Sequence, residues 1–438
     1  MKYFHTVNNL SFELDDATGC AMFYNIDKNV KIEELIIPQY VKYDKKKYLV
    51  TSIEALTCYD FHSLVRVVIP EGVTYIGHSA FGKCENLHEI VFPSTLKEIG
   101  YDVFSSCFAL CEIVIPDCVE KIGMGAFYNC KSLQKVKLPS TLKSIEAMLF
   151  SKCTALKEVV IPEGIESVLY RAFDCCSSLV EVNLPQTIVR IDEYVFFNCT
   201  SLKSVFLPEN LHNIVWCSFN CCHELQYINR NDVVIESGYI LSADATVLLS
   251  SLYKYDREEA IIPHGVKVLE NRSFAWQVGV TNVLMPMGLE RIGEGVFADC
   301  ELLETVDIPA TVYEIGVQAF QHCVALENVT IPEGVVWIGD YAFSHCYEMS
   351  RFTILGDSTM IGKQVWEGCD SLQHIIVPEL RLSPFQEILL SEGDTIMREN
   401  EQYVPIHTLV TTAKVVDTVN SNLWHSLWIG DDEESCKS

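Results

Sequence analysis

The densest group of potentially reactive side chains in this chain lies between residues 217 and 223. Its members are Cys217, Cys221, Cys222 and His223, and Cys175 and Cys176 precede it by two sequence repeats. Thiolates and imidazoles bind Zn²⁺, but a zinc site needs four such ligands converging on one point. Cys176 and Cys222 recur at a repeated position that is expected to point into a core. The group therefore predicts no metal site, and the sequence indicates no cofactor.

Catalytic chemistry is not indicated either. The chain contains no G-x-S-x-G, H-E-x-x-H, Walker A or G-x-G-x-x-G motif. Gly77-His78-Ser79 has the residue types of a nucleophile turn, but it lies where a repeat turns a corner. The 12 histidines are scattered over different repeat positions without a recurring carboxylate partner. No catalytic residue is assigned, and the sequence predicts that the protein is not an enzyme.

The elements that position these side chains come from a 23-residue repeat. Leu64–Pro93 reads LVRVVIPEGVTYIGHSAFGKCENLHEIVFP, and its parts return along most of the chain. A fixed period of this length indicates a solenoid, in which each unit buries its apolar face against its neighbours. The repeated prolines are Pro70, Pro93, Pro116, Pro139, Pro162, Pro185, Pro208, Pro263, Pro286, Pro309, Pro332 and Pro378. Aromatic residues follow eleven positions later, from Phe81, Phe104, Phe127, Phe150, Phe173, Phe196 and Phe219 to Phe274, Phe297, Phe320, Phe343 and Trp366.

Each repeat predicts one coil with four parts. The alternation of Ile90 and Phe92 indicates a short strand. Pro93 makes a corner, because proline fixes φ and cannot donate to a sheet ladder. Leu96 and Ile99 form a second short strand, and the segment from Ala80 to Leu87 has the spacing of a helical or 3₁₀ turn. About thirteen coils plus caps, stacked at the strand spacing, make a β-rich rod or arc roughly 60 Å long.

The composition limits which classes of binding partner and which cellular compartment are expected. A formal net charge of −27 disfavours nucleic acid, which needs Lys and Arg, and anionic membrane surfaces. No apolar run is long enough to span a membrane, and residues 1–16 do not resemble a signal peptide. A cytoplasmic location is therefore expected, with a cell-surface or secreted location as the alternative. Eleven of the 19 cysteines share one repeat position, which indicates small buried thiols and suits a reducing compartment.

Changes in the period predict five segments. Residues 1–50 form an N-terminal cap with a hairpin around Asp44-Lys45-Lys46-Lys47. Residues 51–231 and 263–378 are two blocks of repeats. Residues 232–262 are an inserted hairpin that either projects from the solenoid or replaces part of a coil, and they offer Tyr239 as a binding residue. Residues 379–438 form a C-terminal cap and an acidic tail.

The repeat unit LxxVxIPxxVxxIGxxAFxxC closely resembles the BspA-like, or Treponema pallidum-type, leucine-rich repeat. Residues 133–139 and 335–346 match it position by position, and the resemblance covers roughly residues 35–378. It implies a right-handed leucine-rich-repeat solenoid. Members of this family are commonly bacterial or protist surface proteins with roles in adhesion and protein–protein contact.

The candidate binding surface is the row of residues two positions before each proline. These side chains alternate with core positions, so they point outward, and many of them are apolar. The row four positions before the proline is mostly charged, and an apolar strip with a charged rim suits protein recognition. Strand propensity alone would also place Val and Ile there. The assigned residues are Val68, Val91, Val114, Val160, Phe206, Ile261 and Leu284, together with Tyr239.

These features predict a non-catalytic scaffold that binds a protein partner through this face and through the inserted hairpin. A cell-surface adhesin is one alternative. The other is a structural spacer whose faces bind only further copies of the same chain.

Overall fold

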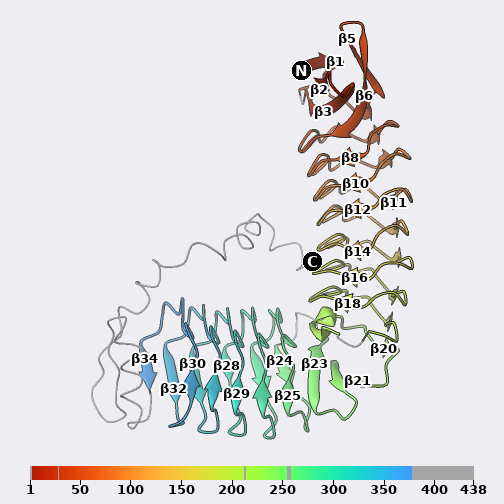
Figure 1. The fold of residues 1–438 in the computed structure, drawn as a ribbon. Helices are drawn as coiled ribbons and strands as arrows, with labels where there is room; N and C mark the ends of the chain where they lie inside the picture. Colours follow the sequence, from red (N-terminus) through yellow and green to blue (C-terminus); the bar gives the residue numbers. More distant parts are fainter. Residues whose placement is uncertain (1, 28, 212–213, 254–257, 377–438) are drawn as a thin grey trace. The chain divides into compact units, whose positions relative to one another are not determined.

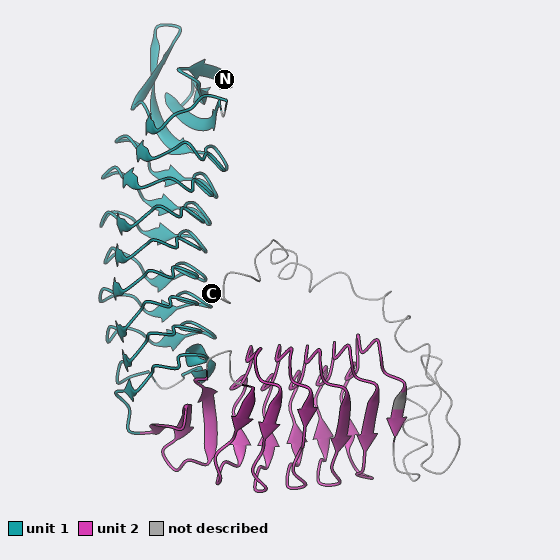
Figure 2. Cartoon of the chain, turned by 180° about the vertical axis from the view of Figure 1, so that it is seen from behind, with its two compact units in different colours: residues 1–231 teal, residues 232–438 magenta. Residues whose placement is uncertain are grey.

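The protein is a repeat solenoid, as the period predicts (Figure 1). The computed structural model describes residues 2–27, 29–211, 214–253 and 258–376. The chain divides into two compact units, residues 1–231 (unit 1) and 232–438 (unit 2), which are coloured separately in Figure 2. The cap and acidic tail predicted for residues 379–438 lie outside the described residues.

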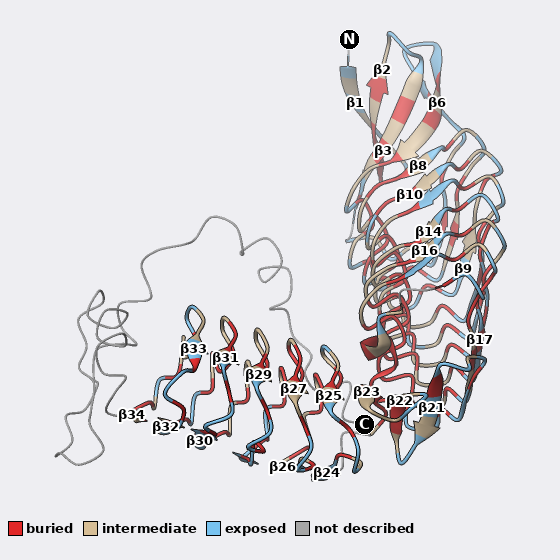
Figure 3. Ribbon diagram, turned by 60° about the horizontal axis from the view of Figure 1, so that its bottom comes forward, coloured by how far each residue is buried: buried red, intermediate tan, exposed pale blue. Residues whose placement is uncertain are grey.

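One strand of each coil ends just before the repeated proline. Figure 3 shows buried and exposed segments alternating along the coils, and in strands such as Glu112–Val114 and Glu158–Val160 the middle side chain is buried. In unit 1 these strands are β4 (Glu34–Ile36), β7 (Arg66–Val68), β9 (Glu89–Val91), β11 (Glu112–Val114), β13 (Lys135–Lys137), β15 (Glu158–Val160), β17 (Glu181–Asn183), β19 (Ser204–Phe206) and β20 (Tyr227–Ile228). In unit 2 they are β24 (Glu259–Ile261), β26 (Asn282–Leu284), β28 (Thr305–Val306), β30 (Asn328–Ile331), β32 (Arg351–Ile354) and β34 (His374–Ile376).

A second parallel ladder follows the proline corner in both units. Its strands carry only one or two residues of each coil because the chain turns again at once. In unit 1 they are β8 (Tyr75–Ile76), β10 (Glu98–Ile99), β12 (Lys121–Ile122), β14 (Ser144–Ile145), β16 (Ser167–Val168) and β18 (Arg190–Ile191). In unit 2 they are β25 (Val268–Leu269), β27 (Arg291–Ile292), β29 (Glu314–Ile315), β31 (Trp337–Ile338) and β33 (Met360–Ile361). Gly123 completes one such corner, where an added Cβ would lie 2.5 Å from the backbone nitrogen of Tyr101.

The third side of the coil differs from the helical turn expected from its spacing. Ser79 and Lys83 have positive φ, and the amides of Ser79, Phe81 and Lys83 donate to carbonyls of the next coil. A continuous helical turn would instead direct these amides along its own axis. The segment is therefore a run of tight turns bonded from coil to coil. Within the described residues, the one 3₁₀ helix is η1 (Trp216–Phe219).

The repeated Phe side chains form a continuous stack inside the coils. From Phe81 to Phe219, successive ring centroids lie 5.5–5.8 Å apart with planes within 20° of parallel. The cysteine three residues later is buried beside this stack. The thiol of Cys130 donates to the carbonyl of Phe104, one coil earlier, at 3.2 Å. The cysteines of the other coils repeat this bond, so each one links two coils as well as filling space.

Both units begin with an antiparallel meander. In unit 1 it consists of β1 (Lys2–Val7), β2 (Leu10–Asp15) and β3 (Cys20–Ile26), and β3 then pairs in parallel with β6 (Lys46–Ile53). In unit 2 it consists of β21 (Val233–Glu236), β22 (Tyr239–Ser242) and β23 (Val247–Ser251), and β23 pairs in parallel with β25. The inserted segment is therefore the first layer of unit 2 and covers the edge of its coils. No helix in the described ranges is both long and apolar enough to cross a membrane.

Candidate protein-binding face

The row predicted to point outward is exposed over much of unit 1. Val114 is 65% exposed and Val160 is 53% exposed, while Val68, Val91 and Phe206 are half-buried. These side chains follow one another because the parallel strands are in register, for example Val68 opposite Val91. We call the apolar members of this row in unit 1 the stripe, which consists of Ile36, Val68, Val91, Val114, Val160 and Phe206.

Ile36 is a member that the sequence reasoning missed. It is 60% exposed, and β4 pairs with β7 so that Ile36 lies opposite Val68. The signal was present, since Ile36 stands two residues before Pro38. The hairpin inserted between Pro38 and Pro70 hides this relation by lengthening the period to 32 residues.

The stripe is interrupted by polar side chains. Lys137 lies between Val114 and Val160 in the register, and Asn183 lies opposite Phe206. The Phe206 ring packs beside Tyr227 with a centroid distance of 5.6 Å. The surface therefore offers an apolar block from Ile36 to Val114, with separate apolar contacts farther along.

Unit 2 carries a shorter version of this row. Ile261 and Leu284 lie opposite each other and are 49% and 44% exposed. The next three positions are Asp307, Thr330 and Thr353. The row is thus polar over three coils before Ile376, which lies opposite Thr353.

Tyr239 requires a correction, because its side chain is fully buried. Its ring packs against Tyr253 and Phe274, and its hydroxyl donates to the carbonyl of Ile261 at 3.0 Å. It thus extends the aromatic core of unit 2 into the first layer. The proposal that Tyr239 contacts a partner is wrong for this side chain.

The rim of the stripe is charged and partly ordered into ion pairs. Arg66 forms ion pairs with Glu34 and, at 2.9 Å, with Glu89. Lys135 lies 3.8 Å from Glu158. These groups are about one-third or more exposed, so each pair contributes at most about 1 kcal/mol to stability. Their main consequence is a fixed pattern of charge along the stripe.

The cysteine group at residues 217–223 lies largely in the core. Cys217, Cys221 and Cys222 are buried, and Cys222 donates its thiol to the carbonyl of Phe196 at 3.0 Å. Burial raises the pKa of Cys222 to about 12, which keeps it a neutral thiol rather than a thiolate ligand or nucleophile. Over the residues that the structure describes, no three His, Cys, Asp or Glu side chains are arranged to hold a metal ion.

Gly77-His78-Ser79 forms a corner of a coil. The His78 ring stacks on Tyr101 with a centroid distance of 4.7 Å and an interplanar angle of 9°. Ser79 takes its positive φ because its amide donates to the Tyr101 carbonyl of the next coil. The packing of this turn therefore explains why Gly77, His78 and Ser79 occur together at this position.

The family model of the BspA type leucine rich repeat region matches residues 51–168, 120–239 and 267–389, which together make up more than half of the chain. The chain belongs to this family. The short strands, proline corners and stacked Phe side chains described above are the form that the repeat takes in this member.

Several solved structures are similar to this chain. A leucine rich cell surface protein from Faecalibacterium prausnitzii is 25% identical, with a TM-score of 0.53, over 86% of this chain and 94% of that one. The T. pallidum leucine rich repeat protein is 29% identical, with a TM-score of 0.42, over 46% of this chain and 91% of that one. A leucine-rich repeat protein from Bacteroides ovatus is 23% identical, with a TM-score of 0.45, over 91% and 99%. No curated protein matches the chain.

Proposed function

We propose that this protein is a non-catalytic scaffold that binds a protein partner through the stripe of unit 1. The observation that carries the proposal is the row of exposed apolar side chains with Val114 and Ile36 at least 60% exposed. Apolar side chains aligned at one-strand spacing and bordered by charges have the anatomy of a protein interface. Solenoids commonly use such extended faces to hold partners.

The buried thiols support a binding role over a catalytic one. The described cysteines of the ladder are buried, and burial raises the pKa of Cys130 as well as that of Cys222 to about 12. Protonated thiols inside the core cannot act as nucleophiles at neutral pH. The ladder cysteines therefore act as core residues that leave the surface rows to make contacts.

The test replaces Val91, Val114 and Val160 with Lys in the full-length chain. These side chains point away from the core, so circular dichroism should report an unchanged fold. Proximity labelling in the source cells, with the wild type and the variant at equal levels, should show the main labelled partner lost from the variant. Val189→Lys is the matched control, because Val189 is 62% exposed but lies on the other side of the proline corner. Equal labelling by the wild type and the triple variant would refute the stripe as the binding face.

A cell-surface location is the second candidate, because the F. prausnitzii relative is a cell surface protein. Protease treatment of intact cells distinguishes the two locations. Loss of this chain from intact cells would place it outside and make it a candidate adhesin. Protection from the protease, with cleavage once the cells are lysed, would place its partners inside the cell.

A further inference from the structure

The N-terminal sheet of unit 1 ends in a strand whose outer edge has no partner. In the described part of the chain β1 pairs only with β2, at the end of the sheet (Figure 3). An unpaired edge is a template for a strand of another chain, so proteins usually shorten it, bend it with a bulge or place Pro and charged residues on it. β1 is six residues long, contains no Pro and runs along β2 without a bulge. Its lysine, Lys2, is bound to Glu13 of β2 at 2.5 Å.

The turn between β1 and β2 determines which backbone groups face this edge. Asn8 and Asn9 both have positive φ, as in the type I′ turn of a two-residue hairpin. Val7 and Leu10 flank the turn, so they exchange both backbone hydrogen bonds, and such pairs recur at every second residue. The backbone groups that point away from β2 consequently belong to Lys2, Phe4 and Thr6. No other backbone group of the described chain bonds them.

The side chains of the same three residues are exposed. Phe4 is 68% exposed, and its ring makes an edge-on contact with Tyr24 of β3 at a centroid distance of 5.3 Å. Thr6 bonds Ser11 of β2 at 3.0 Å. The outer face of β1 therefore offers one large apolar ring at the centre of the strand.

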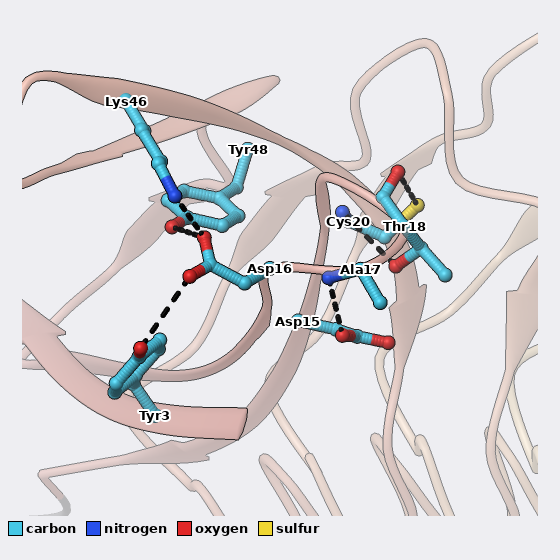
Figure 4. A network of polar contacts seen from close by, with 8 residues as sticks. All are labelled: Tyr3, Asp15, Asp16, Ala17, Thr18, Cys20, Lys46 and Tyr48. Atoms are coloured by element: carbon cyan, nitrogen blue, oxygen red, sulfur yellow. Dashed lines mark hydrogen bonds and ion pairs between the residues drawn. The ribbon is translucent and has the colours of Figure 1, made fainter. Parts of the chain in front are cut away.

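The opposite face of β1 is fixed to the cap. The Tyr3 hydroxyl donates to the carboxylate of Asp16 at 3.4 Å, and the same carboxylate accepts hydrogen bonds from Lys46 and Tyr48 of β6, both at 2.7 Å (Figure 4). These bonds, those from Lys46 and Tyr48 above all, lower the pKa of Asp16 and keep it charged. The strand is thus held from one side while its outer edge stays open.

The charge of the cap permits a second copy of the chain to approach it. Residues 1–50 contain seven Lys, no Arg and seven Asp or Glu, so their formal net charge is zero. The rest of the chain carries the whole net charge of −27. Like charges repel, so contact between the coils of two copies is opposed, whereas contact between their caps is not.

We propose that β1 pairs antiparallel with β1 of a second copy and joins the two N-terminal sheets. Outward-facing residues must stand opposite outward-facing residues, and the register that pairs all three places the two-fold axis at Phe4. Phe4 then lies opposite Phe4 of the second copy, and Lys2 lies opposite Thr6. These pairs exchange about six backbone hydrogen bonds. No like charges meet, and two aromatic rings stand opposite each other, which is a favourable cross-strand pair.

The contact is isologous because both copies use the same strand, so association stops at a dimer. One strand pair buries less surface than a standard interface, so we expect a dissociation constant of about 10–100 µM. The strands that carry the stripe belong to other sheets than β1, so the stripe stays accessible. A dimer then presents two stripes, which strengthens binding to a partner with two matching sites. This inference goes beyond the proposed function and does not depend on it.

The experiment is sedimentation velocity of the full-length chain at about 1–200 µM under reducing conditions, where the wild type should pass from monomer to dimer. Phe4→Pro should remain monomeric, because Pro removes the outward N–H of residue 4 without removing a bond between β1 and β2. Phe4→Thr is the matched control. It loses the same ring but keeps that N–H, so its dissociation constant should stay within about fivefold of the wild-type value. Circular dichroism should report an unchanged fold for both variants.

A charge exchange tests the register. Phe4→Lys and Phe4→Glu should each be monomeric, because like charges would stand opposite each other at the two-fold axis. An equimolar mixture of the two should form a heterodimer. Val189→Lys adds the same charge as Phe4→Lys at a similarly exposed side chain of the second ladder, and it should dimerise like the wild type. Raising the salt to about 0.5 M should not weaken the wild-type dimer, because backbone bonds hold it and salt screens the repulsion between acidic chains.

A monomeric wild type at about 200 µM would overturn the proposal, and so would dimers of Phe4→Pro or a mixture of folded charge variants that stays dissociated. If the wild type is monomeric and Phe4→Pro loses a labelled partner, the edge receives a strand of another protein, which also overturns self-pairing. The stripe is tested separately by the triple Val→Lys variant. Loss of labelling there with a monomeric wild type would leave the proposed function standing, and a dimer with unchanged labelling would leave only the strand pairing.

Discussion

Alkaline pH should destabilise unit 1 through its buried thiols, and Cys130 gives the clearest single test. Its thiol is fully buried, donates to the Phe104 carbonyl, and has its pKa raised from the ordinary value of 9.0 to about 12 by burial. A raised pKa means that the folded state holds its proton where the unfolded chain releases it. The stabilisation is therefore complete below about pH 9 and is lost as pH rises toward about 12.

The magnitude follows from the shift. Each pH unit between about 9 and 12 lowers the free energy of unfolding by about 1.4 kcal/mol for one such thiol. Cys130→Ala removes this dependence, but at pH 7 it costs about 1–2 kcal/mol because it deletes the hydrogen bond and leaves a small cavity. The variant should thus be less stable than the wild type at pH 7, and the two free energies of unfolding should become equal between about pH 9.5 and 10.5.

The free energy of unfolding is measured for the wild type and Cys130→Ala by urea titration of the full chain under reducing conditions. Circular dichroism monitors unfolding at pH 7, 9, 10 and 11, which gives a curve of stability against pH for each protein. Other groups that titrate in this range, such as Lys and Tyr, are common to both proteins and cancel in the difference. Cys111→Ala is the control for loss of a thiol as such, because Cys111 is exposed and its removal leaves no cavity; it should leave the free energy of unfolding at pH 7 almost unchanged. Parallel curves for Cys130→Ala and the wild type would refute the reasoning, because the folded and unfolded thiols would then hold their protons equally.

Two further predictions concern the same core. Phe150→Ala should lower the free energy of unfolding by about 3–5 kcal/mol in urea titrations, because it removes a fully buried ring from the middle of the Phe stack; a loss below about 1 kcal/mol would mean that the ring is not in the core. A maleimide reagent at neutral pH should modify Cys20, Cys111 and Cys118 within minutes, since they are exposed or half-buried, and the buried ladder cysteines only in urea. Peptide mapping that finds Cys130 or Cys153 modified as fast as Cys111 would contradict this.

The sequence was sufficient for the architecture because each coil repeats the same physical constraints. A proline at a fixed position ends a strand, and a Phe eleven residues later must be buried against the Phe of the next coil. The alternation of side chains in a strand then predicted which row faces solvent, and the exposure of Val114, Val160, Ile261 and Leu284 follows from that rule.

The turn side of the coil could not be predicted in the same way. Residues with positive φ there include Ser79, Lys83, Asn129, Lys152 and Arg171, and no single side-chain type marks these positions. Their conformation is imposed by amides that donate to the next coil, as those of Ser79 and Lys83 do. The spacing of residues within one repeat does not predict hydrogen bonds that form only when coils stack. The three- and four-residue spacing from Ala80 to Leu87 therefore predicts a helical turn, although the structure has a run of tight turns there.

The prediction for Tyr239 was also wrong because a local pattern does not predict contacts with residues far along the chain. The alternating apolar residues of the inserted segment fit an exposed hairpin as well as a cap. The difference depends on Phe274, 35 positions later, which offers its ring to Tyr239. A binding role was assigned because insertions in solenoids often project, whereas this one begins a new sheet.

The second meander gives unit 2 a cap of its own. A solenoid needs a cap wherever its core would otherwise be exposed, and each unit here has its own. In unit 1 the cap includes a hairpin of β5 (Tyr40–Tyr43) and β6 that carries Lys42, Lys45 and Lys47, whereas in unit 2 Tyr239 is a core residue of the first layer. The apolar row also differs, since single polar residues interrupt it in unit 1, whereas in unit 2 Asp307, Thr330 and Thr353 separate Leu284 from Ile376. The described parts of the two units therefore carry different surfaces, and the stripe proposed as the binding face lies in unit 1.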